Sequence, residues 1–105
     1  MEKETKTLIG QATDEQIAEW KKQYGDIWAA TCDGHVAYLK KPSRKALSYA
    51  SVAGKENPLK FNELLLNDCW IAGSEEIKTN DSLFLGVSAK MAELVEIKEA
   101  ELGKL

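Results

Sequence analysis

The spacing of apolar residues predicts a helix in the first quarter of the chain. Ile17, Trp20 and Tyr24 recur at the three- to four-residue interval that places side chains on one face of a helix. Thr13, followed three residues later by a glutamine, fits a capping box, in which both side chains bind unpaired backbone amides of the first turn. We therefore expect a helix that starts at Thr13, buries this stripe and stops at Gly25.

The next segment has the pattern of a β-hairpin. Strand-forming residues lie on both sides of an Asp-Gly pair at positions 33–34, which favours a tight type I′ turn. This turn sets a register in which Cys32 lies opposite His35 and Trp28 lies opposite Leu39. Because an isolated hairpin is marginally stable, we expect helices to cover one face, or another chain to extend the open edge.

Two helices are predicted after the hairpin, between residues 44 and 70. Ser43 is a good N-cap for a helix over residues 44–53. Asn57 and Pro58 then fit the N-cap and first position of a helix that reaches Trp70. This helix is apolar on more than one side, so we expect it to be central in the fold or covered by a partner.

A polar turn over residues 73–79 separates these helices from a last, long one. Asn80 or Asp81 is expected to cap this helix, which we expect to continue to about Gly103. Its apolar stripe comprises Leu83, Phe84, Val87, Met91, Leu94, Val95 and Leu102.

Together these elements predict an α+β fold. We expect a β-hairpin packed with about four helices, the C-terminal one being long. The chain has 105 residues, which is enough for one domain with its own core. We interpret residues 1–12 as a flexible N-terminal arm and residues 13–105 as a single α+β domain.

The charge distribution limits the classes of partner. The net charge is -3, which argues against general binding to the nucleic-acid backbone. Residues 37–60 nevertheless contain six basic residues and one acidic residue, a local charge of +5. Such runs are usually solvated helix faces, and the alternative is a surface for an acidic partner. The six basic residues are Lys40, Lys41, Arg44, Lys45, Lys55 and Lys60.

Several observations indicate a cytoplasmic protein without a membrane partner. The first residues are charged and lack the apolar stretch of a signal peptide. No apolar run approaches the roughly 20 residues needed to span a bilayer. Cys32 and Cys69 are not arranged as a CxxC pair, so free thiols are the simplest interpretation.

Few residues offer catalytic or metal-binding chemistry. Cys32, Asp33 and His35 are close in sequence, but successive strand residues point to opposite faces, so we interpret His35 as a histidine beside a turn. A structural zinc site needs about four nitrogen or sulfur ligands, and only His35 and the two cysteines are present. We therefore expect no enzyme activity, no metal and no cofactor.

Two other groups of residues have ordinary structural explanations. Glu75, Glu76 and Asp81 are interpreted as residues at helix starts, where negative charge is favourable. Among the tryptophans, we assign Trp20 and Trp28 to the core, and we expect Trp70 to pack against the turn that follows it. Aromatic residues are also common anchors of protein interfaces.

Most of the chain resembles small tail assembly chaperones, or tail-chaperone-like proteins, of tailed phages and prophages. The resemblance is carried by YLKKPSR at positions 38–44, KFNELLLNDCW at 60–70, GSEEIK at 73–78 and EIKEAEL at 96–102. The capped helix with Trp20, followed by Tyr24 and Gly25, also fits this family.

The resemblance implies a non-enzymatic cytoplasmic helper. Such a protein would hold the long, helical tape-measure protein in solution until tail-tube subunits polymerise around it. A structural tail adaptor or completion protein is the alternative, as is a host protein of unknown role with the same fold. Self-association is also compatible with these features.

From the charge pattern and the apolar helix, we select seven candidate partner-binding residues. The expected partner is a tape-measure-like helical protein or a second copy of the chain. The candidates are Lys40, Lys41, Arg44, Lys45, Phe61, Leu65 and Trp70.

Overall fold

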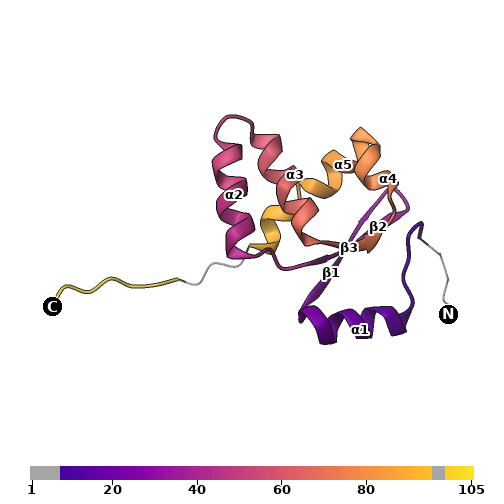
Figure 1. Ribbon diagram of the computed structural model, residues 1–105, viewed down its shortest axis with the longest axis horizontal. Helices are drawn as coiled ribbons and strands as arrows, with labels where there is room; N and C mark the ends of the chain where they lie inside the picture. Colours follow the sequence, from indigo (N-terminus) through magenta and orange to yellow (C-terminus); the bar gives the residue numbers. More distant parts are fainter. Residues whose placement is uncertain (1–7, 96–98) are drawn as a thin grey trace.

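The computed structural model describes residues 8–95 and 99–105 of the chain. Within these residues a three-stranded antiparallel sheet lies between one helix on one face and the remaining helices on the other (Figure 1). The α+β class expected from the sequence is confirmed. The elements are α1 (Asp14–Tyr24), β1 (Ile27–Cys32), β2 (His35–Lys40), α2 (Arg44–Gly54), α3 (Pro58–Cys69), β3 (Trp70–Gly73), α4 (Glu76–Thr79), α5 (Asp81–Ser88) and the 3₁₀-helix η1 (Met91–Leu94).

The predicted helix starts and hairpin are confirmed in detail. The Thr13 hydroxyl accepts a hydrogen bond from the backbone amide of Gln16, which completes the capping box of α1. The hairpin pairs Cys32 with His35, as its turn predicted. Both turn residues have positive φ, 49° at Asp33 and 82° at Gly34, as a type I′ turn requires.

A third strand was not predicted. The helix expected to reach Trp70 ends at Cys69, and β3 then pairs antiparallel with β2, placing Trp70 opposite Leu39 and Gly73 opposite Ala37. Gly73 has a φ of 144°, and a Cβ atom there would lie 2.5 Å from the Val36 carbonyl oxygen. The strand thus depends on a close approach of two backbones that local periodicity does not reveal.

Part of the predicted N-terminal arm is bound to the sheet. The Ile9 amide donates to the Gly34 carbonyl at 2.9 Å, and the Ile9 carbonyl accepts from the Val36 amide at 3.0 Å. The Ala12 amide donates to the Tyr38 hydroxyl at 3.0 Å. These contacts hold residues 8–12 against the domain, whereas residues 1–7 of the predicted arm lie outside the described residues.

The prediction of one long C-terminal helix is wrong. Helix α5 ends at Ser88, and the Lys90 amide bonds to the Val87 carbonyl, a shorter-range bond that tightens the chain into the turn before η1. This bend lets both α5 and η1 place side chains in the core. Residues 96–98 of the predicted helix lie outside the described part of the chain, and residues 99–105 have no regular secondary structure.

The core lies between the sheet and α3, α4, α5 and η1. Leu39 of the sheet packs in one cluster with Leu65 of α3, Val87 of α5 and Met91 of η1. The other face of the sheet carries Tyr38, whose ring lies 5.3 Å from that of Trp20 in α1. Helix α2 packs along α3 and adds Ala50 to this core (Figure 1).

The predictions of burial for the N-terminal aromatic residues need correction. In α1, Ile17 and Trp20 are half-buried, whereas Tyr24 is 41% exposed. Trp28, expected in the core, is 36% exposed. The reason is that α1 packs against β1 and Tyr38 on the face of the sheet opposite the core, and that Trp28 lies on β1, an edge strand.

Candidate functional site

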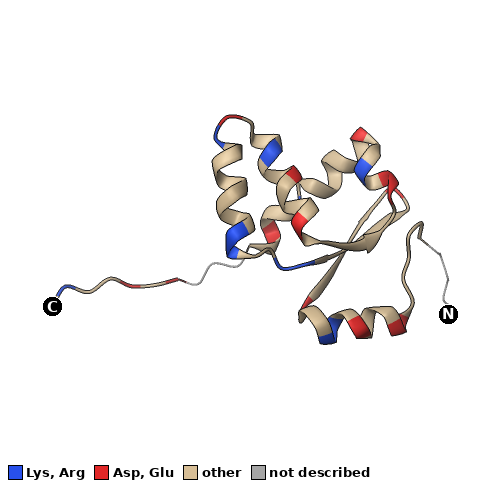
Figure 2. Ribbon diagram, viewed as in Figure 1, with Lys and Arg blue, Asp and Glu red and all other residues tan. Residues whose placement is uncertain are grey.

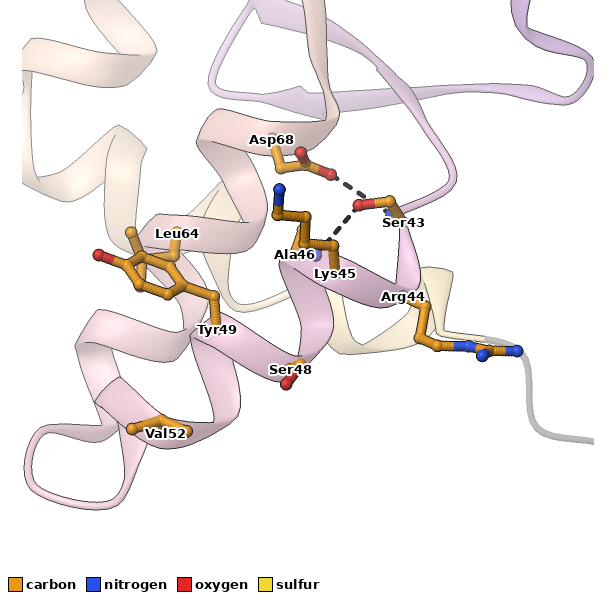
Figure 3. Close-up of a pocket in the computed structure, with 9 residues that line it drawn as sticks. All are labelled: Ser43, Arg44, Lys45, Ala46, Ser48, Tyr49, Val52, Leu64 and Asp68. Carbon is orange, nitrogen blue, oxygen red and sulfur yellow. Dashed lines mark hydrogen bonds between the residues drawn. The ribbon is translucent and has the colours of Figure 1, made fainter.

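A concave surface with a volume of about 1050 Å³ lies along α2 and α3 (Figure 3). We call this surface the α2–α3 groove. It is lined by Ser43, Arg44, Lys45, Ala46, Ser48, Tyr49, Val52, Leu64 and Asp68.

Local hydrogen bonds fix the end of the groove where α2 begins. The Ser43 hydroxyl caps α2 by accepting from the Ala46 amide at 3.0 Å. The Ser43 amide itself donates to the Asp68 carboxylate of α3 at 3.4 Å, which links the start of α2 to the end of α3 (Figure 3). This link fixes the start of α2, where Arg44 and Lys45 are both exposed. The Lys45 side chain points toward Asp68, whereas the Arg44 side chain points away from Tyr49 and Leu64 (Figure 3).

Beyond the other end of the groove, α2 and α3 are in direct contact. A Cβ atom at Gly54 would lie 2.8 Å from the Cβ atom of Phe61, so a glycine is needed for α2 and α3 to approach this closely. The small side chains of α2, including the fully buried Ala50, allow the same close packing along the helix pair.

The groove combines positive charge with apolar surface. Tyr49 is 70% exposed and Val52 is 66% exposed, and Leu64 of α3 is half-buried beside them. The first turn of α2 contains no acidic residue, so the partial positive charge of the helix start adds to that of Arg44 and Lys45. Figure 2 shows the basic residues gathered at this helix start.

A second cleft follows the free edge of the sheet. Side chains of β1, including Trp28 and Cys32, face Val87 of α5 and Leu94 of η1 across it. The six residues of β1 include no charged residue and no proline, the usual features that protect an edge strand from pairing with another chain.

The structure separates the predicted partner-binding residues. Arg44 and Lys45 lie together in the α2–α3 groove, and Lys41 is exposed in the segment before α2. The Lys40 ammonium instead lies 5.9 Å from the centre of the Tyr24 ring, on the side of α1. The charged segment is therefore divided between two faces of the molecule.

The three apolar candidates pack within the fold. Leu65 is fully buried, which corrects its assignment to a partner surface: α3 is covered by α2 on one side and by the sheet on the other. Phe61 is half-buried against Gly54. Trp70 is half-buried, and the Lys78 ammonium lies 4.4 Å from its ring centre, so this tryptophan packs against the following turn as expected.

Tyr49 and Val52 are the groove residues that the sequence reasoning missed. Both lie outside the small-residue stripe that packs α2 against α3. Each is an apolar residue on the solvent-facing side of α2, and an apolar residue at such a position is the sequence signal that could have identified them.

His35 makes contacts that the sequence did not predict. Its Nδ1 atom lies 2.8 Å from the Ser74 hydroxyl and 3.9 Å from a Glu76 carboxylate oxygen. A serine–histidine–carboxylate relay requires the serine and the carboxylate on opposite ring nitrogens, and here both face the same nitrogen. His35 and Ser74 are buried, so we assign this cluster the role of fastening the turn after β3 to β2.

The cysteines differ in environment. Burial raises the pKa of the Cys69 thiol to about 12, and the neighbouring Asp68 charge adds to this effect while Lys40 opposes it. A thiol with this pKa stays protonated near neutral pH and is a poor nucleophile. Cys32 is half-buried at the β1 cleft.

Neither a metal cluster nor a membrane span is found in the part of the chain that the structure describes. Across residues 8–95 and 99–105, no three His, Cys, Asp or Glu residues are grouped in a way that could hold a metal ion. No described helix has both the length and the apolar character to cross a bilayer.

Comparison of the chain with protein-family models, curated proteins and solved structures finds no match.

Proposed function

We propose that this protein is a non-enzymatic, cytoplasmic chaperone of phage or prophage tail assembly, which binds a tape-measure-like helical protein. The observation that supports this proposal most strongly is the α2–α3 groove, whose lining includes two exposed basic residues and two exposed apolar residues. The sequence resemblance to tail assembly chaperones supplies the class of partner.

The groove suits an amphipathic helix that carries acidic residues. Helix-in-groove recognition places the apolar face of a helix against apolar side chains, here Tyr49 and Val52. Acidic residues next to that face would pair with Arg44 and Lys45, which favours one orientation of the bound helix. A tape-measure protein before tube assembly exposes long apolar helical stripes of the kind that such a groove covers.

The proposal is tested by co-purification from cells in which the phage element is induced. Tagged wild-type protein should recover a long helical chain identified by mass spectrometry, and Arg44→Glu/Lys45→Glu should lose it. Lys55→Glu/Lys60→Glu makes the same change of charge outside the groove and should retain the partner. Equal recovery by both double variants, or no long helical partner with the wild type, would contradict the proposal.

The same preparation distinguishes a chaperone from a structural adaptor or completion protein. A chaperone leaves the tape-measure protein as the tube forms, so this chain should be absent from purified particles. Stoichiometric retention of the chain in particles would favour the structural role instead.

A further inference from the structure

Residues 8–12 form a strap, which pairs with the part of the β2 edge that β3 does not reach. Strand β3 pairs with the later residues of β2. At the start of β2, Ile9 forms a parallel bridge with His35. In this bridge the Ile9 amide donates to the Gly34 carbonyl at 2.9 Å, and the Ile9 carbonyl accepts from the Val36 amide at 3.0 Å. The strap thus occupies a strand position on β2.

The strap crosses the turn after β3 at close range. A Cβ atom at Gly10 would overlap the Ser74 amide nitrogen and would lie 2.7 Å from the Gly73 carbonyl carbon. Both are backbone atoms, so this point has room only for glycine. At the end of the strap, the Ala12 amide donates to the Tyr38 hydroxyl at 3.0 Å. The edge therefore takes an extended segment with a glycine where it passes the turn.

Backbone hydrogen bonds, rather than buried side chains, hold the strap in place. Leu8 and Ala12 are half-buried, Ile9 is 53% exposed, and the two residues between Ile9 and Ala12 are exposed. Apolar burial is the main favourable contribution to folding, and segments with few buried apolar contacts open at low free-energy cost. We therefore expect the strap to leave β2 while the core stays folded.

We propose that residues 8–12 are a displaceable strap, and that the β2 edge beneath it is a binding site for an extended peptide segment of a partner protein. The strap is the occupant that the structure shows, so it defines what the site takes: a residue that pairs beside His35, followed by a glycine against Ser74. Binding by strand addition obtains its affinity from main-chain hydrogen bonds. The closed strap competes with such a segment at a high effective concentration, because it belongs to the same chain.

Amide hydrogen exchange of the full-length protein, followed by NMR, tests whether the strap opens alone. The Val36 amide bonds to the strap, whereas the Ser74 amide bonds to the Val36 carbonyl at 2.9 Å and keeps this bond when the strap leaves. After correction for intrinsic rates, Val36 should exchange at least about tenfold faster than Ser74. Gly10→Ala should remove most of the protection of Val36 and leave Ser74 protected. Gly25→Ala is the matched control, because nothing lies within 4 Å of a Cβ atom there, and it should keep Val36 protected.

Peptide titration of the same proteins, also followed by NMR, tests the binding site. The probe is the synthetic peptide LIGQAT, which has the sequence of residues 8–13, at millimolar concentrations. It should bind Gly10→Ala, whose own strap cannot close, and should shift the Val36 amide resonance. The wild type and Gly25→Ala should bind it at least about tenfold more weakly, because their own straps compete. The same peptide with alanine in place of glycine should bind none of the three proteins.

Three outcomes would overturn the proposal. The first is Val36 exchange as slow as that of Ser74 in the wild type, which would show that the strap opens only with the whole domain. This measurement needs no variant, so it decides even where Gly10→Ala does not fold. The others are failure of LIGQAT to bind Gly10→Ala and equal binding of the two peptides by that variant. None of these experiments involves a tail partner, so their outcome is independent of the co-purification test of the proposed function.

Discussion

Replacing Gly73 by alanine tests the strand that sequence reasoning missed. In the folded protein a Cβ atom at this position would lie 2.5 Å from the Val36 carbonyl oxygen and 2.7 Å from the Ala37 Cα atom. Both are backbone atoms of β2, so no side-chain rotation can relieve the overlap. The φ of 144° is in addition a conformation that alanine rarely adopts.

Two costs add in this variant. The backbone conformation costs about 1–3 kcal/mol for a residue other than glycine. Forcing a methyl group into a filled space costs about 1–3 kcal/mol more. We expect Gly73→Ala to lower the free energy of unfolding by about 4 kcal/mol, a large fraction of the roughly 5–15 kcal/mol typical of a domain.

Gly25→Ala is the matched control. Gly25 also has a positive φ, 87°, but nothing lies within 4 Å of a Cβ atom placed there. This variant should lose only the conformational part, about 1–3 kcal/mol. Urea unfolding followed by tryptophan fluorescence measures both variants, and equal losses in the two would refute the close β2–β3 approach described here.

Three further substitutions test the core and its buried polar groups. Ser88→Ala should raise the free energy of unfolding by about 1 kcal/mol in urea, because the buried Ser88 hydroxyl has no hydrogen-bond partner among residues 8–95 and 99–105; a loss of stability would show that the hydroxyl is bonded. Leu65→Ala should lower it by about 2–5 kcal/mol, as expected for a core leucine, whereas a loss below about 1 kcal/mol would indicate a surface position. Cys69 has a pKa raised from 9.0 to about 12, so the folded state keeps a proton that the unfolded chain releases above pH 9. Stability should therefore fall as pH rises from 9 towards 12, and this fall should be smaller in Cys69→Ala; equal slopes would contradict the burial of the thiol.

Helix starts and the hairpin were predictable because their signals are local. Each predicted helix start depends on residues that bind or restrict backbone groups no more than three positions away. These residues are Thr13 with Gln16, Ser43, and Asn57 with Pro58. Such arrangements form in the same way in many folds. The boundaries of α1, α2 and the start of α3 consequently agree with the structure.

The errors concern elements that depend on distant contacts. Strand β3 forms because Gly73 lets the chain approach β2, more than thirty residues earlier in the sequence. The helical stripe through Met91 and Leu94 correctly predicted two buried residues, but not the bend after Ser88 that brings them to the core. Periodicity reports which side chains are buried and does not report where a helix turns.

The candidate site was predictable only in part. The density of positive charge identified Arg44 and Lys45, which lie in the groove. The apolar character of α3 suggested a partner surface, yet it reflects burial by α2 and the sheet, as Leu65 shows. Tyr49 and Val52 were missed because their exposure depends on how α2 packs against α3.

Site-specific photo-crosslinking from the groove tests the proposed function most directly. A photoreactive phenylalanine derivative would replace Tyr49, which is 70% exposed in the groove, and in a control Tyr24, which is 41% exposed on α1. In cells of the proposed phage or prophage system, we expect a crosslink from position 49 to a long tape-measure-like chain, and none from position 24. Absence of that crosslink from position 49, or equal yields from both positions, would contradict the account.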